Sequence, residues 1–133
     1  MLKIKTKIGV SKVHGIGLFA DQFIPKNTVT WEYNPKVDLK ISEKLLNSLD
    51  TINREYLLYY CYFDKKRDCF VLCSDSQRFI NHTKDKKREN ILSSPDKDIS
   101  KRDINIGEEL LCDYNKFDSD YFKRMNIGQD KLV

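Results

Sequence analysis

The sequence predicts a β-rich α+β domain, and three observations support this class. Many short apolar runs have the period of strands, turn-forming residues separate these runs, and helical spacing is confined to a small insert and the end of the chain. A chain of 133 residues is long enough for one hydrophobic core and too short for two. We therefore expect a single domain of many short strands with a small helical insert.

Short strands are predicted along most of the chain. Residues 2–8 alternate between apolar and polar side chains and predict an edge strand that ends at Gly9. Further strands are predicted on both sides of a turn at 25–27, at the apolar run 69–73, on both sides of a turn within 91–104, and at 109–114.

The helical insert is predicted in the middle of the chain. Ser42 is a candidate N-cap for a helix that carries Leu45, Leu46 and Leu49 on one face. A second helix is predicted over residues 52–60.

A third helix is predicted to close the chain. Asp118 or Ser119 is its candidate N-cap, and Gly128 is its candidate stop. We therefore divide the chain into a main domain of residues 1–117 and a short C-terminal helical segment of residues 118–133.

Composition and charge argue against several classes of protein. The chain has 24 Lys and Arg against 20 Asp and Glu, and this net charge of +4 is mild for a dedicated nucleic-acid binder. The first residues lack the apolar core of a signal peptide, and no segment reaches the apolar length of a membrane span. We expect no membrane contact and a location in the cytoplasm or another reducing compartment.

The cysteines predict no metal site. The chain has four of them, none in a CxxC pair, and only two histidines, whereas structural zinc sites usually contain close pairs of ligands. Free thiols fit a reducing compartment. We interpret the cysteines as small buried residues, with Cys112 as a candidate for more.

Two stretches contain candidate binding residues. In VHGIGLFA, Gly15 and Gly17 would let the backbone approach a ligand closely, although such a pair is also common in turns, and the third glycine of a dinucleotide fingerprint is absent. In DSQRFINHTKD, Asn81 and His82 follow an apolar run, and His82 is either a general base or a loop residue with satisfied hydrogen bonds.

A third stretch, INIGEELLCDY, ends the predicted last strand. Glu108 and Glu109 would point to opposite faces of a strand, so they do not predict a catalytic carboxylate pair. Tyr114, at the end of this stretch, is either a core residue or a hydroxyl directed at a reaction.

Together, in this order and spacing, the three stretches resemble the SET domain of protein lysine methyltransferases. The family pattern is Gly-x-Gly, then Arg-Phe-x-Asn-His-Ser, then Gly-Glu-Glu-Leu followed by Asp-Tyr. The resemblance covers roughly residues 1 to 120 and is greatest to small, stand-alone bacterial and viral SET proteins. Thr83 stands where the family has serine, and Asn90 is the counterpart of an asparagine that normally follows sooner.

The resemblance implies a fold with several small sheets and a pseudoknot, and it implies a reaction. The family transfers methyl groups from S-adenosylmethionine to a lysine of a protein, and a histone is one substrate to expect. Residues lining the cofactor would be Gly15, Ile16, Gly17, Arg78, Asn81 and His82, with Phe117 stacked on adenine or packed against the last helix.

The resemblance also implies three residues around the target lysine. Tyr114 would place its hydroxyl beside the transferring methyl group and the amine. Tyr62 is our first choice for a second tyrosine facing the lysine, and Tyr60 is the second choice. By strand alternation, Cys112 would lie on the same side as Tyr114, where its small size would leave room for added methyl groups.

Other functions stay open. A catalytically silent SET-fold module would bind a lysine-containing partner without transferring a methyl group. A small basic module would use KDKKREN and DKKRD on nucleic acid, although such charge runs are usually solvated loops. Two chains could pair to complete a substrate groove, and an effector of this class would act in a host nucleus.

Overall fold

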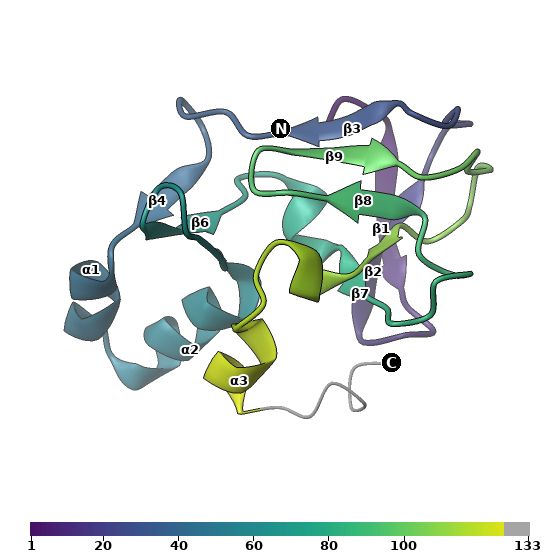
Figure 1. Cartoon of the computed structure of the whole chain (residues 1–133). Helices are drawn as coiled ribbons and strands as arrows, with labels where there is room; N and C mark the ends of the chain where they lie inside the picture. The colour runs from purple at the N-terminus through teal and green to yellow at the C-terminus, as the bar shows by residue number, and fades with distance from the viewer. Residues whose placement is uncertain (127–133) are drawn as a thin grey trace.

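The computed structural model describes residues 1–126 as three small sheets with short helices between them (Figure 1). A two-stranded antiparallel sheet pairs β1 (Thr6–Val10) with β2 (Ile16–Ala20). The largest sheet has the order β3 (Val29–Glu32), β9 (Lys97–Ser100), β8 (Ile91–Ser93), β10 (Leu111–Cys112) and β7 (Asn81–His82). The third sheet has the order β4 (Leu39–Ile41), β6 (Cys69–Leu72) and β5 (Tyr62–Asp64). The predicted β-rich α+β class is confirmed.

The helices are few and short. Two of them, α1 (Glu43–Ser48) and α2 (Thr51–Tyr60), form the expected insert and lie beside the sheet of β4 and β6 (Figure 1). Two 3₁₀ helices follow, η1 (Ser76–Phe79) and η2 (Tyr114–Lys116), and α3 (Tyr121–Met125) is the last described helix. No helix within residues 1–126 is long and apolar enough to cross a bilayer.

The first helix begins and packs as its sequence predicts, with one exception. The Ser42 hydroxyl accepts a hydrogen bond from the Leu45 N–H at 3.1 Å, which confirms the predicted cap. Leu46 is buried and Leu49 is half-buried against the cluster around Ile41, so both face the core. Leu45 is 47% exposed, because a helix this short presents only a narrow stripe to the core.

The start of α3 differs from the prediction. Asp120, and not Asp118 or Ser119, is the N-cap, and it makes no capping hydrogen bond with its side chain. The Asp118 carboxylate instead accepts hydrogen bonds from the Phe63 N–H at 3.0 Å and from Arg124 at 2.6 Å. A long-range partner has therefore replaced the local cap. Gly128, the predicted stop, lies outside the described residues.

The first predicted strand is also shifted. It begins at Thr6 rather than at residue 2, and Gly9 lies within β1 instead of ending it. Gly9 is paired with Gly17 across the hairpin, so tertiary pairing overrides the usual effect of a glycine on a strand.

The last strand, β10, lies between two strands that precede it in sequence. It runs parallel to β7 on one side and to β8 on the other. The Thr83 N–H donates to the Cys112 carbonyl at 2.9 Å, and the Asn90 N–H donates to the Leu111 carbonyl at 3.1 Å. The Asn90 side chain accepts the Leu111 N–H at 2.8 Å. The segment from β7 to β8 therefore encloses β10 on both edges, as the expected pseudoknot requires.

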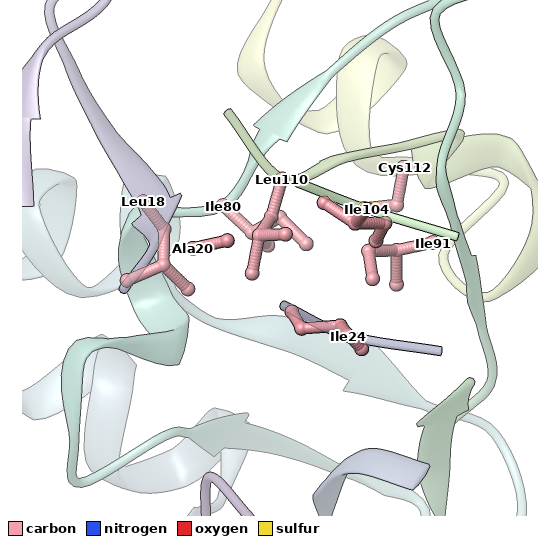
Figure 2. Packing of buried hydrophobic residues seen from close by; sticks show 8 residues of the cluster. All are labelled: Leu18, Ala20, Ile24, Ile80, Ile91, Ile104, Leu110 and Cys112. Atoms are coloured by element: carbon pink, nitrogen blue, oxygen red, sulfur yellow. The ribbon is translucent and has the colours of Figure 1, made fainter. Parts of the chain in front are cut away.

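The main hydrophobic core holds these elements together. Its eight buried residues point toward one another from β2, β8, β10 and the neighbouring loops (Figure 2), and they are Leu18, Ala20, Ile24, Ile80, Ile91, Ile104, Leu110 and Cys112. Burying each of the larger aliphatic side chains contributes about 1.5–3 kcal/mol. Because Ile80 precedes Asn81 and Leu110 precedes the last strand, this core brings the second and third motifs into contact.

Candidate functional site

Two pockets meet at one wall of the molecule. The first, which we call the glycine pocket, is lined on its own side by His14, Gly15, Ile16, Phe79, Asn81 and His82. The second, which we call the aromatic pocket, is lined on its own side by Trp31, Cys61, Tyr62, Cys73, Gln77, Ser93, Ser94, Asp98, Phe117 and Asp118. Six residues line both pockets, namely Tyr59, Tyr60, Arg78, Ile80, Tyr114 and Tyr121.

Tyr114 lies at the junction where the two pockets meet, and hydrogen bonds hold both its hydroxyl and its backbone N–H. Its hydroxyl donates a hydrogen bond to the Ile80 carbonyl at 2.5 Å, and its backbone N–H donates to His82 Nδ1 at 3.1 Å. Tyr121 packs edge-on against its ring at 5.1 Å, and Phe122 stacks on it at 6.0 Å. Burial raises the pKa of Tyr114 well above its ordinary value. The hydroxyl is therefore neutral and held in one orientation.

The end of β10 determines where this tyrosine lies. The predicted strand over 109–114 is wrong in its length, because β10 ends at Cys112 and Tyr114 begins η2. The Asp113 carboxylate accepts the Asn115 N–H at 3.2 Å and caps η2. The backbone thus leaves the sheet one residue before Tyr114, so strand alternation does not relate Tyr114 to Cys112.

Asn81 connects the second motif to the glycine stretch. Its amide Nδ2 lies 3.0 Å from the carbonyl oxygens of His14 and Ile16 and 3.0 Å from Glu109 Oε1. Glu109 Oε1 also accepts the Ser11 hydroxyl at 2.7 Å. One amide therefore holds the backbone on both sides of the first glycine of the motif.

Backbone conformation favours glycine at position 15, whereas lack of space favours it at position 17. Gly15 has a φ of +50°, a conformation that other residues adopt only with strain. At Gly17, a Cβ would clash with the Glu109 carboxylate, which hydrogen bonds from Ser11 and Asn81 hold in place. Gly15 and Ile16 line the glycine pocket, whereas Gly17 lies behind it against Glu109.

His82 presents one ring nitrogen without a partner. Its Nδ1 accepts the Tyr114 N–H, so the proton of the neutral ring is on Nε2. This Nε2 is buried and has no hydrogen-bond partner within residues 1–126. Burial lowers the pKa of His82, and the nearby Asp113 opposes that effect without reversing it. The ring is therefore neutral at pH 7 and has a free donor in a residue that lines the glycine pocket.

The structure brings most of the predicted cofactor residues together. Gly15, Ile16, Arg78, Asn81 and His82 line one pocket together with Tyr114. Of the two other predicted residues, Gly17 packs against Glu109 and does not line the pocket, and Phe117 lines the aromatic pocket.

Phe117 lines the aromatic pocket and packs against two of its tyrosines. Its ring meets the rings of Tyr62 and Tyr114 edge-on, each at 5.7 Å. The stacking of Phe117 on adenine stays a prediction.

Neither Tyr62 nor Cys112, the other two residues predicted around the target lysine, lines the glycine pocket. The Tyr62 hydroxyl donates to the Pro95 carbonyl at 2.9 Å, and Tyr62 lines only the aromatic pocket. Tyr60, the second choice, lines both pockets. Cys112 is fully buried in the main core and lines neither pocket, although it lies close to Ser93, which lines the aromatic pocket. The roles proposed for Tyr62 and Cys112 stay predictions.

Sequence reasoning missed several residues that line the pockets. His14 and Tyr59 form a hydrogen bond of 2.7 Å at the rim, and the Tyr121 hydroxyl donates to the Tyr59 carbonyl at 2.8 Å. The dense tyrosines of 56–62 were a signal that aromatic residues gather here. Their spacing did not indicate which of them would line a pocket. Within residues 1–126, no group of three or more potential ligands could hold a metal ion.

Comparisons with known proteins place the chain in a family. The SET domain family model matches residues 15–115. The histone-lysine N-methyltransferase trr of Drosophila melanogaster is 32% identical over 114 residues, which cover 81% of this chain and 5% of that protein. This chain therefore spans only a small part of that relative.

Solved structures have the same fold. CpSET8 from Cryptosporidium is 29% identical with a TM-score of 0.58, over 84% of this chain and 58% of that one. The ctPRC2 structure in an autoinhibited conformation bound to S-adenosylmethionine is 22% identical with a TM-score of 0.66, over 92% of this chain and 16% of that one. The matched family model covers the residues of all three motifs, including Tyr114. The chain therefore belongs to the SET-domain family.

Proposed function

We propose that this chain transfers methyl groups from S-adenosylmethionine to a lysine side chain of a protein. The observation that supports this most is the position of Tyr114, whose neutral hydroxyl is fixed at the junction of two pockets. A reaction between two ligands needs such a junction, because each ligand then enters from its own side and the reacting atoms meet at one hydroxyl.

The glycine pocket fits the cofactor. S-adenosylmethionine carries hydrogen-bond acceptors on its adenine and its carboxylate, and the unpartnered Nε2–H of His82 is a buried donor suited to one of them. The backbone of Gly15 and Ile16, held by Asn81, would form a close-fitting wall, and Arg78 would add a positive charge. When bound, this cofactor supplies an electrophilic methyl group on a positively charged sulfur.

The aromatic pocket fits the lysine. A lysine chain is apolar up to its amine, and the rings of Trp31, Tyr62 and Phe117 form an apolar wall with edge-on contacts of 5.7–6.4 Å. The amine must be neutral to react, and at pH 7 its deprotonation costs roughly 4–5 kcal/mol relative to a free pKa of about 10.4. Burial in an apolar pocket reduces that cost.

The charges of the two basic runs favour the enzyme over a nucleic-acid module. Lys86 of KDKKREN donates to Asp113 at 2.8 Å, and Arg67 of DKKRD donates to Asp96 at 2.6 Å. Because these cations are paired within the fold, the two runs provide fewer free cations than the sequence suggests.

The substrate and the setting belong to the same proposal. A histone is one candidate, since the matched Drosophila relative is a histone-lysine N-methyltransferase. A reducing compartment suits the four buried free cysteines. Pairing of two chains to complete the substrate groove, and action in a host nucleus, are further parts of this proposal.

The proposal is tested with S-adenosylmethionine that carries a labelled methyl group. The purified chain is incubated with this cofactor and either core histones or a mixed lysate, and the labelled protein is digested and sequenced by mass spectrometry. We expect label on lysine. A chain that binds lysine peptides but neither binds the cofactor nor transfers label would be a silent binding module, and the proposal would be wrong.

A further inference from the structure

Asp98 is a buried carboxylate in the wall of the aromatic pocket. It belongs to β9, is 3% exposed and lines the same pocket as Tyr114. Its Oδ2 accepts a hydrogen bond from Gln77 Nε2 at 2.5 Å. Within residues 1–126, no lysine, arginine or histidine forms an ion pair with it. Burying an ionised carboxylate without a cation is costly, so a cation that enters the pocket would stabilise the charged form of Asp98.

The surroundings of Asp98 make it a base suited to neutral pH. Burial raises its pKa to about 7, and the hydrogen bonds from Ser93, from Gln77 and from the Ser94 backbone oppose this effect only in part. A carboxylate with such a pKa is on the order of a thousandfold more basic than an ordinary aspartate. General bases work best when their pKa lies near the working pH.

Among the described residues of the pocket wall, no group other than Asp98 is suited to accept a proton at neutral pH. Burial raises the pKa of the Cys61 thiol to about 12 and also raises the pKa values of Cys73 and Tyr62, so all three stay protonated at neutral pH. Asp118 is paired with Arg124 at 2.6 Å. Cys112 on β10 lies outside the pocket wall and is likewise protonated, because burial raises its pKa.

The remaining charged group of the wall is Arg78, which is a permanent cation and lines both pockets. Arg78 lies where the two pockets meet, whereas Asp98 lines only the aromatic pocket. The two ends of the aromatic pocket thus differ in charge, and an ammonium group is drawn toward Asp98.

We propose that Asp98 accepts the proton that the target ammonium group loses before methyl transfer. This inference rests on the proposed function. In the step, one N–H bond of the ammonium breaks and its electron pair stays on nitrogen, while the proton forms an O–H bond with the Asp98 carboxylate. The neutral amine then has the lone pair needed to attack the methyl group. The carboxylic acid returns its proton to water when the product leaves, which restores the base.

The first test measures Asp98 directly and needs no turnover. Protein with ¹³C-labelled aspartate carboxyl groups is titrated by NMR, and the Asp98 signal is identified by its loss in Asp98→Asn. The probe is n-butylammonium chloride, which is a lysine side chain without its backbone. We expect a pKa near 7 that falls when the probe is bound, because a cation favours the carboxylate. A pKa that the probe leaves unchanged would overturn the inference.

The second test measures the rate of methyl transfer against pH, with the substrate protein that the labelling experiment identifies. We expect Asp98→Asn to lose on the order of a hundredfold in rate at about pH 7, and to lose much less at about pH 9.5 because more of the lysine is then already neutral. An equal loss at every pH would show a purely structural role and overturn the inference. The matched control is Asp38→Asn, a carboxylate that is also buried but lines neither pocket, and the shape of its profile should match the wild type.

A further variant covers the case in which Asp98→Asn fails to fold. Gln77→Met removes the donor to Asp98 but keeps the carboxylate, so the pKa of Asp98 should rise and the profile should shift to higher pH. A profile that stays in place would contradict the role of Asp98. A wild type that transfers no methyl group at any pH would contradict the proposed function, and the NMR titration would still decide whether Asp98 binds an ammonium ion.

Discussion

At the scale of single residues, a few polar side chains connect segments that are far apart in the sequence. Asn81 contacts the carbonyls of His14 and Ile16, and His82 contacts the backbone of Tyr114. A motif search finds these residues because their types are unusual in a strand. It does not reveal the partner of each atom, since the partners are backbone groups that any residue supplies.

Replacing Asn81 with alanine tests its part in shaping the glycine pocket. Two carbonyls would lose their donor, and an unpaired buried polar group costs about 1–3 kcal/mol. We expect calorimetry to show cofactor affinity reduced by about tenfold or more. Asn53→Ala, at an exposed position in the first turn of α2, is the control and should leave affinity unchanged. Undiminished affinity in Asn81→Ala would show that the glycine stretch is not shaped for the cofactor by this amide.

Cys112 provides a test of how many methyl groups the product carries. We expect the wild type to add more than one, and Cys112→Tyr to shift the product toward monomethyl-lysine as measured by mass spectrometry. Because Cys112 is fully buried, the larger side chain should also lower stability by about 1–3 kcal/mol.

Cys112→Phe separates the two effects of this change. It adds nearly the same bulk without the hydroxyl, so it should leave more of the higher methylation states than Cys112→Tyr does. A wild type that only monomethylates, or a product distribution that Cys112→Tyr leaves unaltered, would refute the role of Cys112.

At the scale of elements, local signals predicted those boundaries that local hydrogen bonds determine. The Ser42 cap and the extent of α2 are of this kind. The start of α3 is not, because Asp118 bonds to Phe63 and Arg124 instead of capping. Likewise, β10 ends early because Asp113 caps a 3₁₀ helix that the apolar pattern does not show.

The pairing of β1 with β2 leads to a prediction about two glycines. Gly17→Ala would push a Cβ into Glu109, whose carboxylate also contacts Asn81, so we expect lower stability and weaker cofactor binding. Gly107→Ala is the matched control, because its φ of +87° makes alanine strained while its surroundings are open. Both variants should have a lower melting temperature, and only Gly17→Ala should bind the cofactor less tightly in calorimetry. Equal cofactor affinities in the two variants would show that the position of Glu109 beside Gly17 does not affect the glycine pocket.

At the scale of the whole molecule, a buried carboxylate links distant parts of the chain. Glu89 is 1% exposed and is paired with Lys101 at 2.9 Å and with Lys116. Burial alone raises the pKa of Glu89, but the two lysines outweigh it and hold that pKa below its ordinary value. A lowered carboxyl pKa means that the pairing stabilises the fold above the unfolded pKa of about 4.3 and that this contribution is lost as the pH falls further.

Glu89→Gln should therefore cost stability at pH 7, by about 1–3 kcal/mol because the lysines remain partly solvated. The difference from the wild type should shrink as the pH is lowered through about 4, which urea unfolding at several pH values would measure. A difference that is the same at acid and neutral pH would show that the charge of Glu89 does not stabilise the fold.

The arrangement of the whole site follows from a topology that local patterns do not encode. The three motifs are identifiable in the sequence, but their meeting depends on β10 passing between β7 and β8. Asp98 reaches the pocket wall from β9, which pairs with β3 and β8, although an alternating strand pattern indicates only an ordinary polar residue there. The resemblance to the SET family predicts this topology, whereas the partners of each side chain follow only from the contacts in the structure.

The most direct test of the central claim is the rate of methyl transfer by Tyr114→Phe. This change keeps the ring contacts and removes only the hydroxyl that meets the Ile80 carbonyl at the junction of the pockets. Tyr33→Phe is the matched control, since the Tyr33 hydroxyl is buried without a partner within residues 1–126 and lines neither pocket. We expect Tyr114→Phe to bind the cofactor nearly as the wild type does and to turn over at least about a hundredfold more slowly, with Tyr33→Phe unaffected. Full activity in Tyr114→Phe would contradict the assignment of this site.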